Sequence, residues 1–347
     1  EIASCLVGSE MCIRDRYREK SVEQRKRMVF FMSKRRRRKR RKHMLMGFIL
    51  FLTVTYGLLA LGTWAVGNLL QKNRETEQGV LSETLNLQKL SSKAAVLTDL
   101  STGKILAEKK GDERIYPASL TKIMTAVLAM EKLDNLDDTT VLDGDMFREL
   151  YAQGASMASF APQDQVSYRD LLYGALLPLG AECCEALARV CDGSEEAFVK
   201  EMNQKAKKLG MKHTNFKNVT GLHDKDHYTT AEDLSLLLEY ALKNQEFYEI
   251  FTAKSHSMAP TASHPEGFTV YSTMRQEMEQ NGISEPGILG GKTGYTSEAG
   301  LCLGSLLSLG GKEYILITAD APGSHETEPS HILDAAEVCR QLSLIGS

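Results

Sequence analysis

Ser119 and Lys122 have the residue types and the spacing that acyl-transfer chemistry needs. They stand near the start of residues 116–130, whose apolar period predicts a helix, so both side chains lie on one face, about 5–6 Å apart at Cβ. A serine hydroxyl attacks once a base takes its proton, and burial favours the neutral lysine that can act as that base. We predict Ser119 as the nucleophile, with its backbone N–H as half of an oxyanion hole, and Lys122 as the base.

A second Ser-x-x-Lys pattern shows that this spacing alone is weak evidence. Ser101 and Lys104 repeat it between two expected strands, residues 94–99 and 105–108, where Gly103 predicts a hairpin turn. We interpret that copy as structural. The Ser119 copy therefore needs chemical partners from elsewhere in the chain.

A stretch that begins at residue 290 and reads Gly-Gly-Lys-Thr-Gly-Tyr-Thr supplies such partners. Lys292 and Thr293 offer a cation and a hydroxyl that can bind a carboxylate. Gly294 allows a substrate backbone to approach the expected strand, and the N–H of Tyr295 can complete the oxyanion hole. A phosphate-binding loop is the alternative, but it requires a glycine where Pro286 stands and a helix afterwards, whereas a strand is expected here.

Together, the Ser119-x-x-Lys122 pattern and the Lys292-Thr-Gly294 stretch resemble the motifs of penicillin-binding proteins and serine β-lactamases. Within this superfamily the chain is most similar to the serine D-alanyl-D-alanine carboxypeptidases, over about residues 90–345. Three further stretches carry the resemblance: Leu97-Thr-Asp-Leu-Ser-Thr-Gly-Lys-Ile-Leu106, Thr220-Gly-Leu-His-Asp224 with Tyr228-Thr-Thr-Ala-Glu-Asp233, and Gly291-Lys-Thr-Gly-Tyr-Thr-Ser-Glu-Ala-Gly300.

The resemblance implies a serine peptidase that acts outside the cytoplasm on peptidoglycan stem peptides. Ser119 would attack the carbonyl between two terminal D-alanines, Lys292 and Thr293 would bind the terminal carboxylate, and water would hydrolyse the acyl-enzyme. Such a protein also binds β-lactam antibiotics covalently, needs no metal or organic cofactor, and has no nucleic-acid partner. Its role would be in cell-wall biosynthesis and cell shape.

One motif of the family is altered in this chain. Relatives carry Ser-x-Asn between the helix of the nucleophile and the Lys-Thr-Gly strand, whereas Leu179 stands here in place of the serine and Ala181 in place of the asparagine. The missing serine helps to carry a proton to the leaving amine, so its loss predicts a slower reaction. Two alternatives stay open: a wall-binding or penicillin-binding protein with impaired catalysis, and a β-lactamase, for which no carboxylate that could activate the deacylating water is evident.

The order of the expected elements predicts an α+β fold for residues 93–347, which we call the body. In this fold an antiparallel sheet joins both ends of the body, and helices flank the sheet. The resemblance adds a helical subdomain. Thr229 with Glu232 forms a capping-box pattern ahead of one helix. Periodicity and turn residues predict helices at 116–133, 168–190, 195–209, 234–242 and 330–345, and strands at 94–99, 105–108, 288–296, 302–307 and 314–318.

Charge is divided unevenly along the chain. Residues 1–66 contain 16 Lys/Arg against 5 Asp/Glu and the remainder contains 26 against 40, although the net charge is only −3. Residues 34–42 are all basic, and residues 44–70 contain no charge over a length sufficient to span a bilayer. Because basic residues beside a span stay in the cytoplasm, we expect an uncleaved single-pass anchor with the body outside. The alternative for the basic run is a nucleic-acid patch.

These features give the expected domain organisation. Residues 1–43 form a basic cytoplasmic tail, in which residues 1–20 have no apolar period and are interpreted as a translated assembly artefact or a disordered extension. The transmembrane anchor covers residues 44–70 and a polar linker covers residues 71–92. The serine peptidase-like catalytic domain covers residues 93–347.

Neither the cysteines nor the histidines predict a metal site. The seven cysteines are odd in number and match no zinc pattern, and the adjacent Cys183 and Cys184 are interpreted as small packing residues. His223 and His227 stand four residues apart, but the aspartates between them and the preceding Thr-Gly indicate a loop. We therefore expect a site without metal.

Overall fold

The computed structural model describes residues 27–53, 55–57, 59–64, 66–68 and 85–345. The chain divides into two compact units, residues 1–76 and 77–347, which are described separately. The segment interpreted as an artefact, residues 1–20, and most of the predicted linker, residues 71–84, lie outside the described residues.

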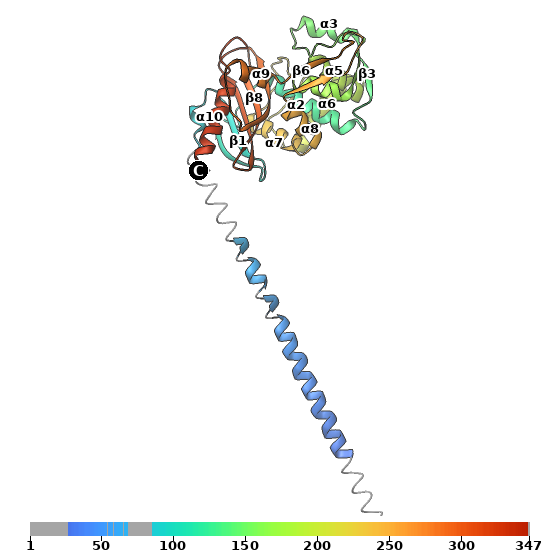
Figure 1. The fold of residues 1–347 in the computed structure, drawn as a ribbon, viewed down its shortest axis with the longest axis vertical. Helices are drawn as coiled ribbons and strands as arrows, with labels where there is room; N and C mark the ends of the chain where they lie inside the picture. Colours follow the sequence, from blue (N-terminus) through green and yellow to red (C-terminus); the bar gives the residue numbers. More distant parts are fainter. Residues whose placement is uncertain (1–26, 54, 58, 65, 69–84, 346–347) are drawn as a thin grey trace, which may run out of the picture. The chain divides into compact units, whose positions relative to one another are not determined.

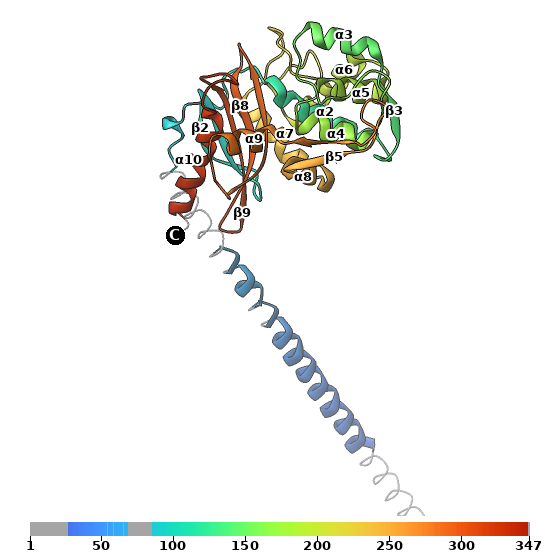
Figure 2. The ribbon, with the colours of Figure 1, turned by 45° about the horizontal axis from the view of Figure 1, so that its top comes forward.

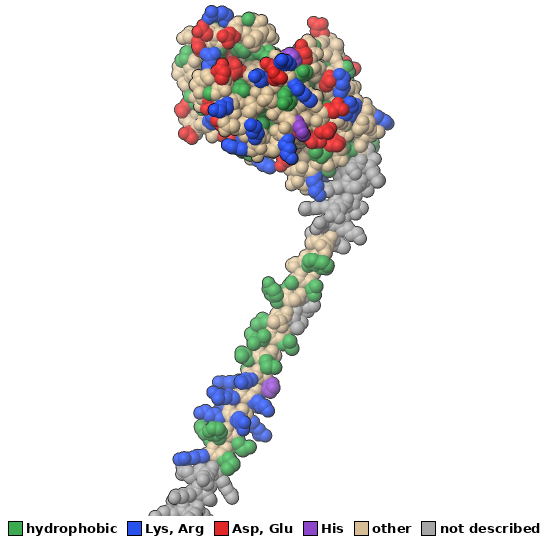
Figure 3. Space-filling view, turned by 180° about the vertical axis from the view of Figure 1, so that it is seen from behind, with side chains coloured by type: hydrophobic (Ala, Val, Ile, Leu, Met, Phe, Trp, Pro, Cys, Tyr) green, Lys and Arg blue, Asp and Glu red, His purple; other side chains and the backbone are tan. Residues whose placement is uncertain are grey.

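The described part of the first unit contains one helix, Arg27–Asn68, that is long and apolar enough to cross a membrane. Its most apolar part has a mean hydropathy of 2.2, and a signal sequence near an N-terminus meets the same criteria of length and composition. Residues 34–42 belong to this helix and are exposed, and Figure 3 shows their Lys and Arg side chains as a dense cluster beside hydrophobic ones. The helix is a candidate membrane span.

Five antiparallel strands form the central sheet of the second unit: β1 (Ala94–Asp99), β2 (Lys104–Lys109), β7 (Ile288–Thr296), β8 (Gly300–Leu309) and β9 (Lys312–Ala321). Their order is β2-β1-β9-β8-β7, and Figure 1 shows the sheet with β1 and β8 labelled. β1 pairs with β9, with Val96 opposite Ile317, so the start of the body is held against its end. The predicted α+β fold with a sheet that joins both ends is confirmed.

Helices cover both faces of this sheet (Figure 2). α10 (Ser330–Ile345) packs on the face to which Leu97 contributes. α2 (Thr121–Lys132) and α7 (Ala231–Ala241) pack on the opposite face, to which the neighbouring Val96 contributes. The strand residues are apolar on both sides because successive side chains point to opposite faces and both faces are covered.

A helical subdomain lies beside the sheet (Figure 1). Its helices are α3 (Gly144–Ala152), α4 (Tyr168–Leu176), α5 (Ala181–Asp192), α6 (Glu195–Leu209) and α8 (Gln245–Thr252). Two hairpins accompany them, β3 (Thr139–Val141) with β4 (Gln165–Ser167), and β5 (Ser255–Met258) with β6 (Phe268–Tyr271). α2 is buried at every position from Thr121 to Ala129, so it packs against the subdomain on one side and the sheet on the other.

The predicted helix at residues 168–190 is wrong as one element, because residues 177–180 separate α4 from α5. Pro178 lacks the N–H that a continuing helix would use. Leu179 has a φ of 70°, in the left-handed region. Gly180 lies so close to its surroundings that a Cβ there would be 2.6 Å from the Cβ of Ala158. Periodicity identified the helical stretches, and these chain-breaking residues decide where they end.

Three helices lie where none was predicted: α3, α8 and α9 (Thr273–Gln280). Each has only eight or nine residues, which is shorter than the window of about 11–18 residues over which helical periodicity is judged. The cap of α7 also differs from the prediction. Thr230, rather than Thr229, accepts a hydrogen bond from the N–H of Asp233 at 3.1 Å. Thr229 instead shares a hydrogen bond with Thr214.

Candidate active site

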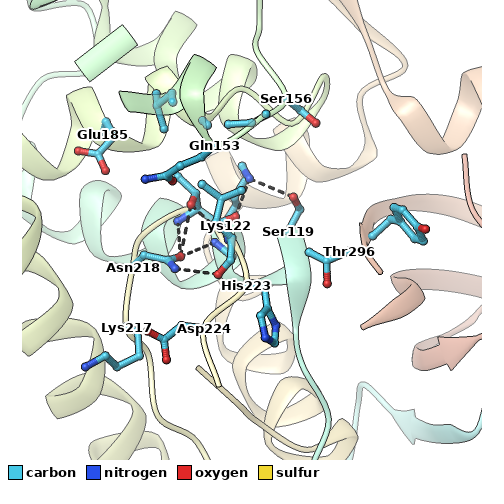
Figure 4. A pocket seen from close by; sticks show the side chains of 18 of the residues that line it. Ser119, Lys122, Gln153, Ser156, Glu185, Lys217, Asn218, His223, Asp224 and Thr296 are labelled. Carbon is cyan, nitrogen blue, oxygen red and sulfur yellow. Dashed lines mark hydrogen bonds between the residues drawn. The ribbon is translucent and has the colours of Figure 1, made fainter. Parts of the chain in front are cut away.

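Ser119 lies in a single 3-10 turn, η2 (Ala118–Leu120), that leads directly into α2. Lys122 follows one turn later, and its Nζ donates a hydrogen bond to Ser119 Oγ at 3.0 Å (Figure 4). Ala118 has a φ of 45°, a conformation that costs a non-glycine residue about 1–2 kcal/mol. Such strain is concentrated at functional sites. The two residues predicted as nucleophile and base are therefore in direct contact, next to a strained backbone.

Lys122 occupies an environment that favours its neutral form. The side chain is buried, and Nζ also donates to the carbonyl oxygen of Thr220 at 2.6 Å. Burial lowers the pKa of Lys122 and outweighs the opposite influence of Cys184 and Glu182. A lower pKa increases the fraction of the lysine that can accept a proton from Ser119.

The loop at residues 218–222 holds the nucleophile turn from one side. Gly221 has a φ of 86°, and a Cβ there would lie 1.8 Å from the carbonyl oxygen of Ala118, so only glycine fits. Asn218 shapes the loop, because its Oδ1 accepts a hydrogen bond from the N–H of Gly221 at 2.7 Å and its Nδ2 donates to the carbonyl of Leu222 (Figure 4). Sequence analysis noted the Thr-Gly pair here but missed the role of Asn218.

Strand β7 holds the same turn from the other side. A Cβ on Gly294 would lie 2.9 Å from the backbone nitrogen of Ser119, so the strand and the turn are in close backbone contact. The predicted role of Gly294, to let a substrate backbone approach the strand, stays a prediction. Lys292 and Thr293 are 1% and 2% exposed. Lys292 Nζ donates to the carbonyl of Thr293, and burial, followed by the charge of Lys122, lowers its pKa well below the ordinary lysine value. A bound carboxylate would raise this pKa again.

A groove of about 760 Å³ opens at Ser119. Tyr295 lines it near the nucleophile, and Glu149, Glu185 and Glu195 line a more distant part, where Figure 4 shows Glu185 pointing away from Ser119. Burial and the nearby Glu195 raise the pKa of Glu185 to about 8. The groove thus has a serine and a lysine at one place and carboxyl groups at another. Lys292 and Thr293 are not among its lining residues.

The second motif contributes backbone and apolar atoms only. Leu179 is 6% exposed and has a left-handed backbone, and Ala181 lines the groove. The N–H of Ala181 donates to the carbonyl of Ser156 at 2.8 Å, which fixes the start of α5 beside the groove. Neither side chain can donate or accept a hydrogen bond where the family pattern has a hydroxyl and an amide.

Glu182 is a residue that sequence analysis missed. It is fully buried in the first turn of α5, and its Oε1 accepts a hydrogen bond from the N–H of Ala158 at 2.7 Å. Its Oε2 has no hydrogen-bond partner among the described residues. Burial raises the pKa of Glu182 to about 7. A glutamate after a glycine and an alanine gave no signal of burial in the sequence.

The remaining candidates have structural roles. Ser101 Oγ donates to Asp99 Oδ1 at 2.6 Å inside the β1–β2 hairpin. His227 is buried and accepts at Nδ1 from the N–H of Lys217, so its Nε2 donates to Thr121 Oγ1 at 2.9 Å. His223 instead lies in the groove. Among the described residues there is no group of three or more His, Cys, Asp and Glu side chains that could hold a metal ion.

Comparison with known proteins identifies the family. Residues 81–323 match the peptidase S11 family, described as D-alanyl-D-alanine carboxypeptidase. The chain belongs to this family. The resemblance found in the sequence is therefore confirmed, and the fold of this chain is similar to that of the solved structures described next.

Curated relatives include three enzymes with this name. DacF of Bacillus subtilis is 34% identical over 250 residues, which are 71% of this chain and 62% of that protein. DacC of Escherichia coli is 38% identical over 161 residues, 45% of this chain and 40% of that protein. The carboxypeptidase of Streptomyces sp. K15 is 31% identical over 245 residues, 67% of this chain and 82% of that protein. The chain thus spans less than two thirds of the length of the first two.

Solved structures agree with this assignment. The Streptomyces K15 DD-transpeptidase has a TM-score of 0.65 and 26% identity, covering 73% of this chain and 97% of that one. The D-alanyl-D-alanine carboxypeptidase of Mycobacterium tuberculosis has a TM-score of 0.62 at 24% identity, covering 73% and 92%. The second similarity concerns the fold alone.

Proposed function

We propose that the protein is a D-alanyl-D-alanine carboxypeptidase that removes the terminal D-alanine from peptidoglycan stem peptides through an acyl-enzyme on Ser119. The hydrogen bond between Lys122 Nζ and Ser119 Oγ, in a chain of the S11 family, is the observation that carries the proposal. By the same chemistry, a β-lactam antibiotic would acylate Ser119 and remain attached.

Acylation begins when Lys122 takes the proton of Ser119 and Oγ attacks the carbonyl carbon between the two D-alanines. The N–H groups of Ser119 and Tyr295 hold the negative oxygen of the tetrahedral intermediate. The bond from carbon to nitrogen then breaks, and the proton passes to the departing amine. Lys292 and Thr293 bind the carboxylate of the leaving D-alanine and fix which peptide end can enter.

Deacylation reverses the same proton transfer. Lys122 takes a proton from water, the hydroxide attacks the ester carbonyl, and the proton returns to Ser119 Oγ as the shortened peptide leaves. The lowered pKa of Lys122 supports this role because the lysine must be neutral at the start of each half-reaction.

Covalent labelling tests the proposal. Full-length protein in detergent is treated with a fluorescent penicillin, and mass spectrometry locates the adduct. We expect the adduct on the peptide that contains Ser119, loss of labelling in Ser119→Ala, and normal labelling in the matched control Ser101→Ala. An adduct on Ser101, or no adduct on the natural protein at any drug concentration, contradicts the assignment.

A penicillin-binding protein with impaired catalysis is the second candidate. Leu179 favours it, together with the burial of Lys292 and Thr293, which leaves little of the carboxylate-binding pair accessible in the free protein. Measurement of D-alanine release from a stem pentapeptide separates the two: labelling by penicillin without release of D-alanine supports the impaired protein.

A further inference from the structure

Thr273, the first residue of α9, connects two of the segments that form the active site. Its Oγ1 lies 2.8 Å from Thr293 Oγ1 on β7. Its backbone N–H donates to the carbonyl oxygen of Leu177 at 3.2 Å, and its Oγ1 lies 3.4 Å from the same oxygen. Leu177 belongs to the break between α4 and α5 that also contains Leu179. Thr273 therefore touches both the segment just before the second motif and the Lys-Thr-Gly strand.

The hydrogen bond between the two hydroxyl groups can run in either of two directions, because each threonine has a single O–H and either can be the donor. In the first, Thr273 donates to Leu177 and Thr293 donates to Thr273, so Thr293 has no proton left for a ligand. In the second, Thr273 donates to Thr293 and the proton of Thr293 is free. The carbonyl of Leu177 keeps its hydrogen bond from the N–H of Thr273 in either case.

A ligand that only accepts hydrogen bonds selects the second arrangement. A carboxylate has no proton to donate, so Thr293 can bind it only as a donor. Thr293 is 2% exposed, which limits exchange of its partners with water. Its hydroxyl oxygen would still need a donor once its own proton points to the carboxylate, and Thr273 is the side chain at hydrogen-bond distance that supplies one.

We propose that Thr273 is a positioning residue for substrate binding: it donates to Thr293 Oγ1 and so directs the proton of Thr293 to the terminal carboxylate of the peptide. The inference rests on the proposed function, because it assumes a substrate with a free carboxylate. It adds a residue outside the three sequence motifs and assigns it to recognition of the peptide end, with no part in proton transfer to the leaving amine.

The test compares Thr273→Val with Thr273→Ser in the full-length protein. Valine keeps the shape and the backbone N–H but removes the hydroxyl, whereas serine keeps the hydroxyl. For a peptide ending in D-alanyl-D-alanine, we expect Thr273→Val to raise KM at least about tenfold while kcat changes less than twofold, since a charge-assisted hydrogen bond is weakened. Thr273→Ser should restore KM to near the natural value.

Two further measurements separate positioning from other roles. With a depsipeptide that ends in D-lactate, which has the same carboxylate but a better leaving group, the KM effect should be equally large. On a Thr293→Val background, Thr273→Val should have little further effect, because its action passes through Thr293. An effect on kcat confined to the amide substrate, or full additivity of the two substitutions, overturns the inference.

Failure of the inference is distinguishable from failure of the proposed function. Penicillin also carries a carboxylate, so its rate of acylation should fall at least about tenfold in Thr273→Val, a second readout that does not require D-alanine release. Natural protein that reacts normally, with Thr273→Val unchanged on both readouts, overturns the inference alone. Natural protein that neither releases D-alanine nor reacts with penicillin overturns the proposed function and the inference with it.

Discussion

At the scale of single residues, Leu179 distinguishes this site from the family pattern. It has a left-handed backbone with a φ of 70° and an apolar side chain that is 6% exposed. A leucine pays a conformational cost there without offering a hydrogen bond, so local preference does not explain the backbone. Two contacts hold the turn in this shape. Gly180 fits closely against Ala158, and the carbonyl oxygen of Leu177 accepts a hydrogen bond from the N–H of Thr273. The turn at this position thus has a backbone held by its neighbours and no side-chain hydroxyl.

Restoring that hydroxyl should speed the reaction. Positioned proton transfer contributes typically about 10²–10⁴-fold, so we expect Leu179→Ser to raise the rate of D-alanine release by at least about tenfold, or about 1.4 kcal/mol of barrier. The rate of acylation by penicillin should rise less, because strain in the β-lactam ring makes that reaction depend less on proton transfer to the leaving nitrogen. Leu179→Ala is the matched control, since it removes the same apolar contacts without adding a hydroxyl. Equal rates for the two variants would show that another group carries the proton.

At the scale of elements, the first turn of α5 contains a carboxyl group that couples stability to pH. Glu182 is fully buried, it holds the segment around Ala158, and burial raises its pKa from 4.5 to about 7. The folded protein therefore keeps a proton that the unfolded chain releases as the pH rises above 4.5. The free energy of unfolding falls through this window, and the loss is complete above about pH 7.

Replacing Glu182 by glutamine should remove this part of the pH dependence. Glutamine can still accept from the N–H of Ala158 but does not titrate. From pH 4.5 to pH 8, the unfolding free energy of the natural protein should fall relative to that of Glu182→Gln, by up to about 3 kcal/mol. Urea denaturation followed by circular dichroism at several pH values measures the difference. If the unfolding free energies of the two proteins change with pH in parallel, Glu182 is not a buried carboxyl that keeps its proton up to about pH 7.

At the scale of the whole molecule, the chain combines a helix that carries basic and apolar residues with an acidic body of the peptidase S11 family. The helix Arg27–Asn68 contains the exposed basic residues 34–42 followed by residues without charge. We infer that it anchors the protein in the cell membrane with the basic end in the cytoplasm and the body outside, where peptidoglycan lies. The external location inferred for the body is consistent with the proposed stem-peptide substrate.

Protease accessibility measures this topology. Protease added to cells stripped of their wall should digest residues 77–347 and spare the segment that contains residues 34–42, as detected by antibodies to each. Detergent serves as the control and should expose both parts. Protection of the body would reverse the topology, and a soluble body without the helix would show that the helix is a cleaved signal.

The sequence by itself determined the elements whose signals are local. β1, β7 and α10 follow from apolar runs and turn residues, and Ser119 with Lys122 follows from helical spacing, because one turn brings residues three apart together. The family follows from motifs in which each residue type has a chemical role. The roles assigned to Lys292, Thr293, Gly294 and Tyr295 stay predictions, since they concern a bound substrate.

Only the tertiary structure decided which distant segments meet. The contact of Gly294 with Ser119, the hydrogen bond between Thr273 and Thr293, and the burial of Glu182 join residues that are remote in the chain or lack a local signal. The break at Leu179 likewise depends on close packing against another segment. Periodicity reports which side of an element faces the core, but the partner that covers it is chosen by packing of the whole body.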